Sequence, residues 1–291
     1  MIDNINLNAI EKLLNNRKIN NSKLLSDSFS INCYQIETSD DKKFIVKFYK
    51  ERNNKFNAIN AESKNLKFFE KFKLNNFPKI KACNDDYLIM TYIENDNEKP
   101  LEINLDLLSA IIFLHSQQNK DYGFSFDTQI GGLKHYNSFE NNWINFFRDK
   151  RLNYIYELIN QTNPMDRQIN KKMNLLLNKL ENFIPNNPKP RLLHGDMWEG
   201  NILFDNKKFV GFIDHGSFFG HNEMEIAYLR WFNPIFLDKD FLSKYENYIK
   251  IDKNYLEYET VYQIYYCLLN VYLWDRSYVL NSEQLLNKLK I

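Results

Sequence analysis

The sequence has 291 residues, 44% hydrophobic and 15% aromatic, which is long enough to bury a large core in one domain or two. Its 38 basic and 37 acidic residues leave a formal net charge of +1, which gives no sign of nucleic acid or an anionic membrane as a partner. No apolar run approaches the roughly 18 residues that span a bilayer, and the first residues lack a secretory signal pattern. The composition therefore predicts a folded, cytoplasmic protein that binds neither nucleic acid nor membrane.

The first part of the chain predicts a small β-rich lobe. Apolar periodicity predicts a helix over residues 5–17, and two β-rich runs follow, "FSINCYQIET" and "KKFIVKFY", joined by a polar turn. A second helix, free of Gly and Pro, is expected over residues 57–72, and another strand over residues 86–93. The predicted order in this lobe is helix, strand, strand, helix, strand. The key helix is the second one, residues 57–72.

After the polar stretch "ENDNEKP" the pattern becomes mainly helical. Helical patterns at about 104–118, 138–160 and 165–182 run up to the Pro-rich stretch "PNNPKP", and the chain beyond residue 221 is predicted to be helical again. The sequence therefore predicts an α+β chain of two domains, a small lobe over residues 1–92 and a larger, mainly helical lobe over residues 93–291.

The cysteines give no sign of a disulfide framework or a zinc site. Cys33, Cys83 and Cys267 are odd in number, widely spaced and mostly in apolar surroundings. We expect all three to be reduced thiols.

Residues 192–221 contain five of the chain's eight glycines and the most informative acidic pattern. The tripeptide HGD ends at Asp196, Asn201 follows five positions later, and Asp214 comes after the strand-like "FVGFI". Kinases carry H-x-D-x-x-x-x-N and then D-x-G in this order, and carboxylate and carboxamide oxygens suit Mg²⁺. We therefore expect Asp196, Asn201 and Asp214 to converge at one end of a hairpin, as a phosphoryl-transfer site requires.

The small lobe offers an independent test of this hypothesis, because a kinase needs a strand lysine paired with a helix acid. Lys47 lies inside "FIVKFY", fifteen residues before Glu62. Glu62 shares a helical stripe with Ile59, Leu66 and Phe69, and a carboxylate on such a buried face is costly unless it is paired. The sequence therefore predicts a buried Lys47–Glu62 ion pair.

The turn expected to cover the phosphates, "SDSFSIN", contains no glycine, because all eight glycines lie at or beyond Gly123. Backbone amides with the hydroxyl of Ser26, Ser28 or Ser30 would have to do that work. The absence of a Gly-rich loop is the main observation in the sequence against efficient use of ATP.

Taken together, these motifs resemble the aminoglycoside-phosphotransferase-like small-molecule kinases, and most closely the fructosamine/ketosamine-3-kinase family. The broad group shares "LLHGDxxxxNIL…IDxG", while the tryptophan of "HGDMWEGN" and the segment "SFFGHNEMEIAYL" are similar to the narrower family. The resemblance runs from about residue 20 to 235. It implies a bilobal protein-kinase-like fold that uses ATP and Mg²⁺ to phosphorylate a sugar hydroxyl of a ketosamine, a small glycated amine.

The resemblance also implies roles for the residues of the catalytic core. Asp196 would be the catalytic base, Asn201 and Asp214 would bind Mg²⁺, and Lys47, steadied by Glu62, would contact the α- and β-phosphates. In the nucleotide site, the interlobe residues Met90, Thr91 and Tyr92 would meet adenine through backbone groups. Ser30, also expected in the nucleotide site, takes a place where some relatives carry a cysteine.

On the acceptor side, the resemblance implies that Trp198 packs against the sugar–amine, with His221 and Glu223 nearby or supporting the loop. Carboxylates that could meet a positive amine are those of Glu199, Glu223 and Glu225. The sequence departs from the family where Glu225 replaces an aspartate and His215 a proline. Two alternatives stay open: an aminoglycoside- or choline-type kinase, and a nucleotide-binding pseudokinase with little turnover.

Overall fold

The computed structural model describes residues 2–51, 56–73 and 76–289, and it divides into two compact units, each discontinuous in sequence. The boundary between residues 92 and 93 stays a prediction of where the two lobes divide. The first unit comprises Met1–Lys99, Thr128–Lys134 and Gly200–Gly216, and the second comprises Pro100–Asp127, His135–Glu199 and Ser217–Ile291.

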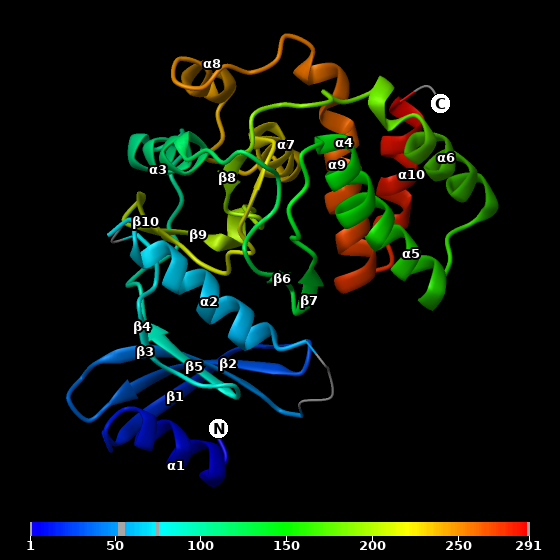
Figure 1. The fold of residues 1–291 in the computed structure, drawn as a ribbon. Helices are drawn as coiled ribbons and strands as arrows, with labels where there is room; N and C mark the ends of the chain where they lie inside the picture. The colour runs from blue at the N-terminus through cyan, green and yellow to red at the C-terminus, as the bar shows by residue number, and fades with distance from the viewer. Residues whose placement is uncertain (1, 52–55, 74–75, 290–291) are drawn as a thin grey trace. The chain divides into compact units, whose positions relative to one another are not determined.

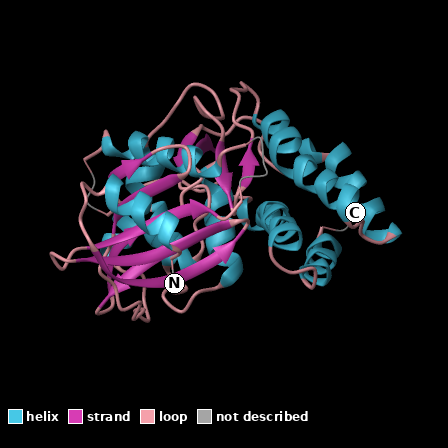
Figure 2. Ribbon diagram, turned by 90° about the horizontal axis from the view of Figure 1, so that it is seen from below, coloured by secondary structure: helices cyan, strands magenta, loops and turns pink. Residues whose placement is uncertain are grey.

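A five-stranded antiparallel sheet in the order β1-β2-β3-β5-β4 is the centre of the first unit (Figures 1 and 2). The two β-rich runs of the sequence form β2 and β3, whose register extends from Ile31 opposite Tyr49 to Glu37 opposite Lys43. Strands β1 and β4 were not predicted from the sequence. The strands are β1 Ile19–Ser28, β2 Ile31–Thr38, β3 Lys43–Tyr49, β4 Ile80–Cys83 and β5 Tyr87–Thr91.

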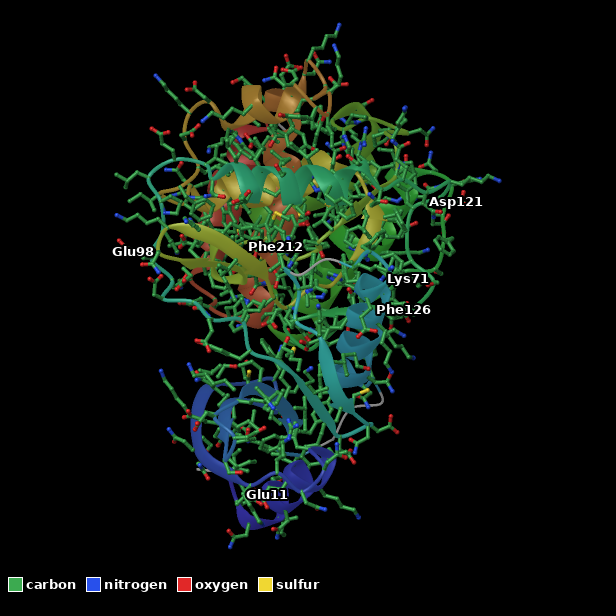
Figure 3. All side chains as sticks on the ribbon, turned by 90° about the vertical axis from the view of Figure 1, so that its left-hand side faces the viewer. Glu11, Lys71, Glu98, Asp121, Phe126 and Phe212 are labelled. Carbon is green, nitrogen blue, oxygen red and sulfur yellow. The ribbon has the colours of Figure 1, made fainter. Side chains whose placement is uncertain are left out.

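Helix α1, Asn4–Leu13, is fastened to the edge strand of this sheet. Its first turn is capped by the Asp3 carboxylate, which accepts backbone hydrogen bonds there. Near its other end, Glu11 (labelled in Figure 3) accepts hydrogen bonds from Lys18 Nζ at 2.7 Å and from the Ile19 amide at 3.0 Å. The pairing ties the helix to the start of β1.

Helix α2, Ala58–Glu70, confirms the predicted second helix, and the side chain of the preceding residue, Asn57, caps its first turn. Its apolar stripe packs with residues of β5: Ile59 and Leu66 form a buried cluster with Leu88 and Met90. This packing turns the same face, and with it Glu62, toward the sheet.

Two short hairpins complete the first unit. The predicted hairpin between Asn201 and Asp214 is formed by β9, Ile202–Asp205, and β10, Lys208–Phe212. Its turn residues Asn206 and Lys207 have φ values of 49° and 63°, so this two-residue turn forms without glycine. The second hairpin pairs β6 Thr128–Ile130 with β7 Leu133–His135, of which the last residue, His135, is assigned to the second unit.

The second unit is mainly helical, as predicted. The helix expected over residues 138–160 begins later, at Trp143, because the Asn142 side chain caps it there, and it contains a π-helical turn at Arg148–Leu152. Among the described residues no helix is long and apolar enough to cross a membrane. The helices are α3 Leu105–Ser116, α4 Trp143–Phe147, α5 Asn153–Thr162, α6 Arg167–Asn178, α7 Asn222–Phe232, α8 Phe241–Glu246, α9 Tyr255–Leu273 and α10 Tyr278–Lys288, with a 3₁₀ turn at Leu180–Asn182. A further 3₁₀ turn, Glu199–Asn201, begins with the last residue of a second-unit segment and ends in the first unit.

A short strand pair within the second unit sets the direction of its loops. Strand β8, Arg191–Leu193, pairs antiparallel with β11, Phe218–Gly220, so that Leu193 lies opposite Phe218 and Arg191 opposite Gly220. The loop that follows Leu193 therefore leaves from one end of the pair. The chain that follows Gly220 leaves from the other end.

Candidate active site

Lys47 is the centre of a buried charge cluster in the first unit. Its Nζ lies 2.7 Å from Oε1 of Glu62 on α2 and 2.5 Å from Oδ1 of Asp214, which confirms the predicted Lys47–Glu62 pair. Burial lowers the pKa of Lys47, but the carboxylates of Asp214 and Glu62 outweigh this and hold that pKa above its ordinary value. The ammonium is therefore charged at neutral pH and can act as a fixed positive group.

Asn201 and Asp214 lie together at one end of the β9–β10 hairpin. Ile202 opens β9 and pairs with Phe212 at the end of β10. Just beyond this pair, the Ile213 amide donates a 3.1 Å hydrogen bond to the Asn201 carbonyl. The first unit thus brings two of the three predicted residues together, whereas Asp196 belongs to the second unit and its convergence with them stays a prediction.

The backbone at Asp214 is left-handed, with φ 56°, a conformation that Asp adopts more readily than most residues. Its side chain is 41% exposed, whereas that of Lys47 is 11% exposed. One carboxylate oxygen meets Lys47, and the side chain keeps an accessible surface. Asp214 therefore retains room for a further charged ligand.

A cavity of about 420 Å³ opens beside this cluster, within the size range of small-molecule sites. Lys47 and Asp214 form part of its wall, and the predicted interlobe residues Met90, Thr91 and Tyr92 line it too. Ser26 is among the lining residues and Ser30 is not. The full lining is Lys23, Leu25, Ser26, Cys33, Gln35, Ile45, Lys47, Pro78, Met90, Thr91, Tyr92, Ile93, Asn95, Asp96, Leu203, Ile213 and Asp214.

The glycine-free β1–β2 turn is built from two residues in the left-handed region. Phe29 and Ser30 have φ values of 54° and 60°, a conformation that costs a non-glycine residue about 1–2 kcal/mol. A Cβ on Gly132, itself at φ 79°, would lie 2.9 Å from the Phe29 Cβ. A glycine at position 132 therefore leaves room for the Phe29 side chain.

The loop that contains Asp196 is held by a buried carboxylate of the second unit, that of Glu225 on α7. Glu225 accepts hydrogen bonds from the amides of His194 at 3.0 Å and Gly195 at 2.7 Å, and its Oε2 lies 3.0 Å from Nε2 of His115. Burial raises the pKa of Glu225, but these hydrogen bonds outweigh it and hold that pKa below its usual value. The fully buried Glu225 is a loop anchor, so the expectation that it could meet a substrate amine is wrong.

Asp196 and the two residues predicted to meet the acceptor lie on this same loop. Asp196, Trp198 and Glu199 are all partly exposed. The Trp198 amide donates to the Asp196 carbonyl at 3.1 Å, and the indole ring packs against Phe232 with centroids 5.9 Å apart. The loop thus presents a carboxylate, an aromatic surface and a second acid within four residues.

The family model for fructosamine kinase matches residues 1–291. The chain is 32% identical over 201 residues to a probable ketoamine kinase of Enterococcus faecium, covering 69% of this chain and 70% of that protein. The chain belongs to the fructosamine kinase family. The chain is also 26% identical over 193 residues to a chloroplastic protein-ribulosamine 3-kinase of Arabidopsis thaliana, covering 66% of this chain and 58% of that protein.

Solved structures show that this fructosamine kinase family member has the bilobal, protein-kinase-like fold. A crystal structure of a candidate fructosamine-3-kinase from Thermobifida fusca matches with a TM-score of 0.84 at 18% identity, covering 98% of each chain. The gentamicin complex of the aminoglycoside phosphotransferase APH(2")-IIa matches with a TM-score of 0.64 at 17% identity, covering 99% of this chain and 96% of that one. At these identities the likeness concerns the fold.

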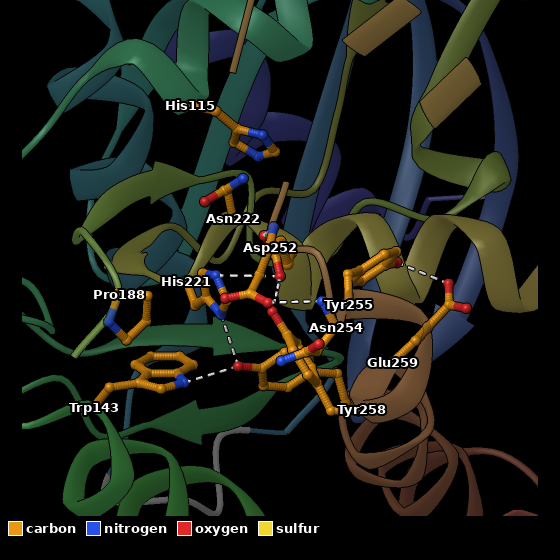
Figure 4. A network of polar contacts seen from close by, with 12 residues as sticks. His115, Trp143, Pro188, His221, Asn222, Asp252, Asn254, Tyr255, Tyr258 and Glu259 are labelled. Carbon is orange, nitrogen blue, oxygen red and sulfur yellow. Dashed lines mark hydrogen bonds and ion pairs between the residues drawn. The ribbon is translucent and has the colours of Figure 1, made fainter. Parts of the chain in front are cut away.

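Two further residues predicted for the acceptor side, His221 and Glu223, stand apart from Asp196. His221 follows the end of β11 that pairs with Arg191, whereas Asp196 follows the opposite end of β8. Both side chains are buried, with 4% and 2% exposed, in a polar network between α7 and α9 (Figure 4). Their direct contact with a substrate stays a prediction, and the structure does not bring them to the Asp196 loop.

The network of Figure 4 fastens the start of α7 to α9. His221 Nδ1 lies 2.8 Å from the Tyr262 hydroxyl, which accepts from Trp143 Nε1 at 3.0 Å. Glu223 accepts hydrogen bonds from the Tyr258 hydroxyl and from the Asp252 amide. Burial raises the pKa of Glu223, but His221 and these two donors outweigh burial and hold that pKa below its usual value. These contacts are internal to the second unit.

The remaining histidines have aromatic or polar neighbours. His215 is 1% exposed, and its ring meets Phe69 and Phe77 edge-on, with centroids 4.9 and 5.2 Å apart. The replacement of the family's proline thus adds an aromatic contact to α2 beside Asp214. His115 is fully buried, and its Nδ1 lies 2.8 Å from the Tyr245 hydroxyl.

Proposed function

We propose that this fructosamine kinase family member transfers the γ-phosphoryl group of ATP to a sugar hydroxyl of a ketosamine, with Mg²⁺ as the metal ion. The observation that carries the proposal is the Lys47 ammonium, held between Glu62 and Asp214 at the wall of the 420 Å³ cavity. Such a fixed cation suits the phosphates of a nucleotide. Family membership supports the reaction class and the ketosamine substrate.

The donor set at the hairpin end fits a hard cation. Asn201 offers a carboxamide and Asp214 a partly exposed carboxylate, and Mg²⁺ is typically held by one or two such groups together with nucleotide phosphates. Among residues 2–51, 56–73 and 76–289, no three His, Cys, Asp or Glu side chains form a metal cluster. When bound, Mg²⁺ would neutralise charge on the phosphoryl oxygens.

The chain's own groups then divide the remaining work. Lys47 would hold the phosphates at the cavity wall, while backbone groups at Met90, Thr91 and Tyr92 would meet the base. The partly exposed Asp196 would orient the acceptor hydroxyl and accept its proton, because a carboxylate held within hydrogen-bond reach of a hydroxyl can act as a general base. Glu225 supports this role by fixing the backbone immediately before Asp196.

For the acceptor, the loop offers a flat aromatic surface at Trp198 and an acid at Glu199. A glycated amine carries apolar ring faces and a positive charge, and these two side chains match both features. Ser30, His221 and Glu223 retain their predicted binding roles as part of this proposal, although the geometry described above favours Ser26 and the Asp196 loop. We place the reaction in the cytoplasm.

The test is a panel of acceptors with Mg-ATP: a ribulosamine, a fructosamine, choline and an aminoglycoside. Thermal shift reports nucleotide binding, and ADP release reports turnover. Fastest turnover on the two ketosamines is the expected result. Turnover confined to choline or the aminoglycoside would move the protein to another acceptor class, and nucleotide binding without turnover on any acceptor would make it a pseudokinase, as the glycine-free turn at Phe29 and Ser30 allows.

A further inference from the structure

We propose that Thr128 is a positioning residue for Asp214: its hydroxyl donates a hydrogen bond to the Gly216 carbonyl at 3.1 Å and thereby fixes the segment whose carboxylate is proposed to bind Mg²⁺. All three residues belong to the first unit. The inference rests on the proposed function in one respect, namely that Asp214 binds the metal ion. The hydrogen bond itself does not depend on which acceptor the enzyme uses.

The backbone of Asp214 needs support from its surroundings. A residue other than glycine in the left-handed region, here at φ 56°, is strained and persists only where neighbouring contacts hold it. Lys47 Nζ meets one oxygen of the Asp214 carboxylate at 2.5 Å, but two side-chain bonds rotate between that carboxylate and the backbone. Contacts on the residues that follow Asp214 must therefore help to hold its backbone.

Each of the next two residues has such a contact. The buried His215 ring meets Phe69 and Phe77 edge-on, which places the side chain but gives little direction to the peptide that follows. Gly216 has no side chain to restrict its own backbone, so the direction of its carbonyl depends on an outside donor. A hydrogen bond to a carbonyl favours a particular direction of the peptide plane, and Thr128 supplies that hydrogen bond.

Thr128 is itself held in a fixed position. It is fully buried at the start of β6, and this strand packs against α2. The β6–β7 hairpin closes with a two-glycine turn, in which the Gly132 amide donates to Gln129 Oε1 at 2.8 Å. As a β-branched residue, Thr128 also has few side-chain rotamers available. The hydroxyl therefore has a defined place from which to hold the Gly216 carbonyl.

The test variant is Thr128→Val, which keeps a β-branched side chain of similar shape and removes the hydroxyl. Thr128→Ser keeps the hydroxyl and serves as the rescue variant. The matched control is Thr38→Val, which alters an equally buried threonine of the first unit. The Thr38 hydroxyl also lies 3.1 Å from a backbone carbonyl, that of Lys42, in the β2–β3 turn.

Calorimetry with ATP over a series of Mg²⁺ concentrations measures the effect. Thr128→Val should need about tenfold more Mg²⁺ for half-maximal binding, because the Asp214 carboxylate is no longer held in place for the ion. Binding of ATP in EDTA should equal that of the parent, since Lys47 is unchanged. Thr128→Ser and Thr38→Val should keep the parent's Mg²⁺ dependence. The same dependence in Thr128→Val, even with a lower unfolding midpoint, would overturn the positioning role.

A measurement without nucleotide separates this inference from the proposed function. The ¹³Cα and ¹³Cβ chemical shifts of Asp214 report its backbone angles. They should move in Thr128→Val and stay in place in Thr128→Ser and Thr38→Val, and unmoved shifts in Thr128→Val would also overturn the role. Moved shifts in a protein whose parent binds ATP without any need for Mg²⁺ would leave the role of Thr128 standing and refute the metal site of the proposed function.

Discussion

Glu225→Ala removes the carboxylate that anchors the loop ahead of Asp196, and the cost can be worked out from its contacts. The fully buried side chain accepts from two backbone amides, those of His194 and Gly195, and it also meets the His115 ring. A hydrogen bond to a charged group is worth about 1.5–3 kcal/mol, and buried donors left without partners add their own penalty. Because the three contacts share one carboxylate, they do not simply add.

We therefore expect Glu225→Ala to lower the free energy of unfolding by about 3–5 kcal/mol, the range found when one partner of a buried charged pair is removed. Urea unfolding measures this loss, and native-state hydrogen exchange should show the His194 and Gly195 amides exchanging faster. Glu246→Ala, which changes an exposed glutamate at the end of α8, should stay within about 0.5 kcal/mol of the parent. A Glu225→Ala protein with the parent's unfolding midpoint and unchanged exchange at these amides would refute the anchoring role.

Three further outcomes are expected. Lys47→Met should weaken Mg-ATP binding by about a hundredfold in calorimetry, since it removes the cation at the cavity wall; binding at the parent's affinity would exclude that cavity as the phosphate site. The pKa of Glu225 in the folded protein lies below its unfolded value near 4.5, so the stability that this carboxylate contributes is present above that value and is lost as pH falls through the folded-state pKa. The unfolding midpoint of Glu225→Gln should therefore fall less on acidification than that of the parent, and an equal fall would contradict this. Burial raises the pKa of Cys33 to about 12, so iodoacetamide at pH 7.5 should label Cys83 before Cys33 in the native protein, and the reverse order by mass spectrometry would count against a buried Cys33.

The sequence predicted the parts of the fold and site that have a local periodic signal. Glu62 could be paired with Lys47 because it shares a helical stripe with apolar residues, and a carboxylate on such a face needs a partner. The β9–β10 hairpin between Asn201 and Asp214 followed from the spacing of the motif. All three cysteines are free, as expected.

The parts that could not be predicted depend on contacts between distant segments. Strand β1 is mostly exposed and has no apolar alternation, so its pairing with β2 supplies the order that its own residues do not signal. The sequence suggests that Glu225 is an acid open to substrate, because nothing in a single sequence reveals that its carboxylate meets backbone amides thirty residues away. Its position, where the resembling family has an aspartate, was the one available signal.

His221 illustrates the same limit. The family resemblance implies that His221 lies near the acceptor or supports the loop, but the antiparallel register of β8 and β11 sends His221 to the end of that strand pair opposite the one from which the Asp196 loop leaves.

The central claim is that this chain moves the γ-phosphoryl group of ATP to a sugar hydroxyl with Asp196 as the base. It is tested most directly by incubating the parent and Asp196→Asn with Mg²⁺, [γ-³²P]ATP and a fructosylated amine, and following the label. The label should appear on the sugar of the amine with the parent, while Asp196→Asn binds Mg-ATP as tightly yet transfers label at a rate lower by a factor of about a hundred or more. Equal transfer by the two proteins, or label that leaves ATP without reaching the sugar, would contradict the claim.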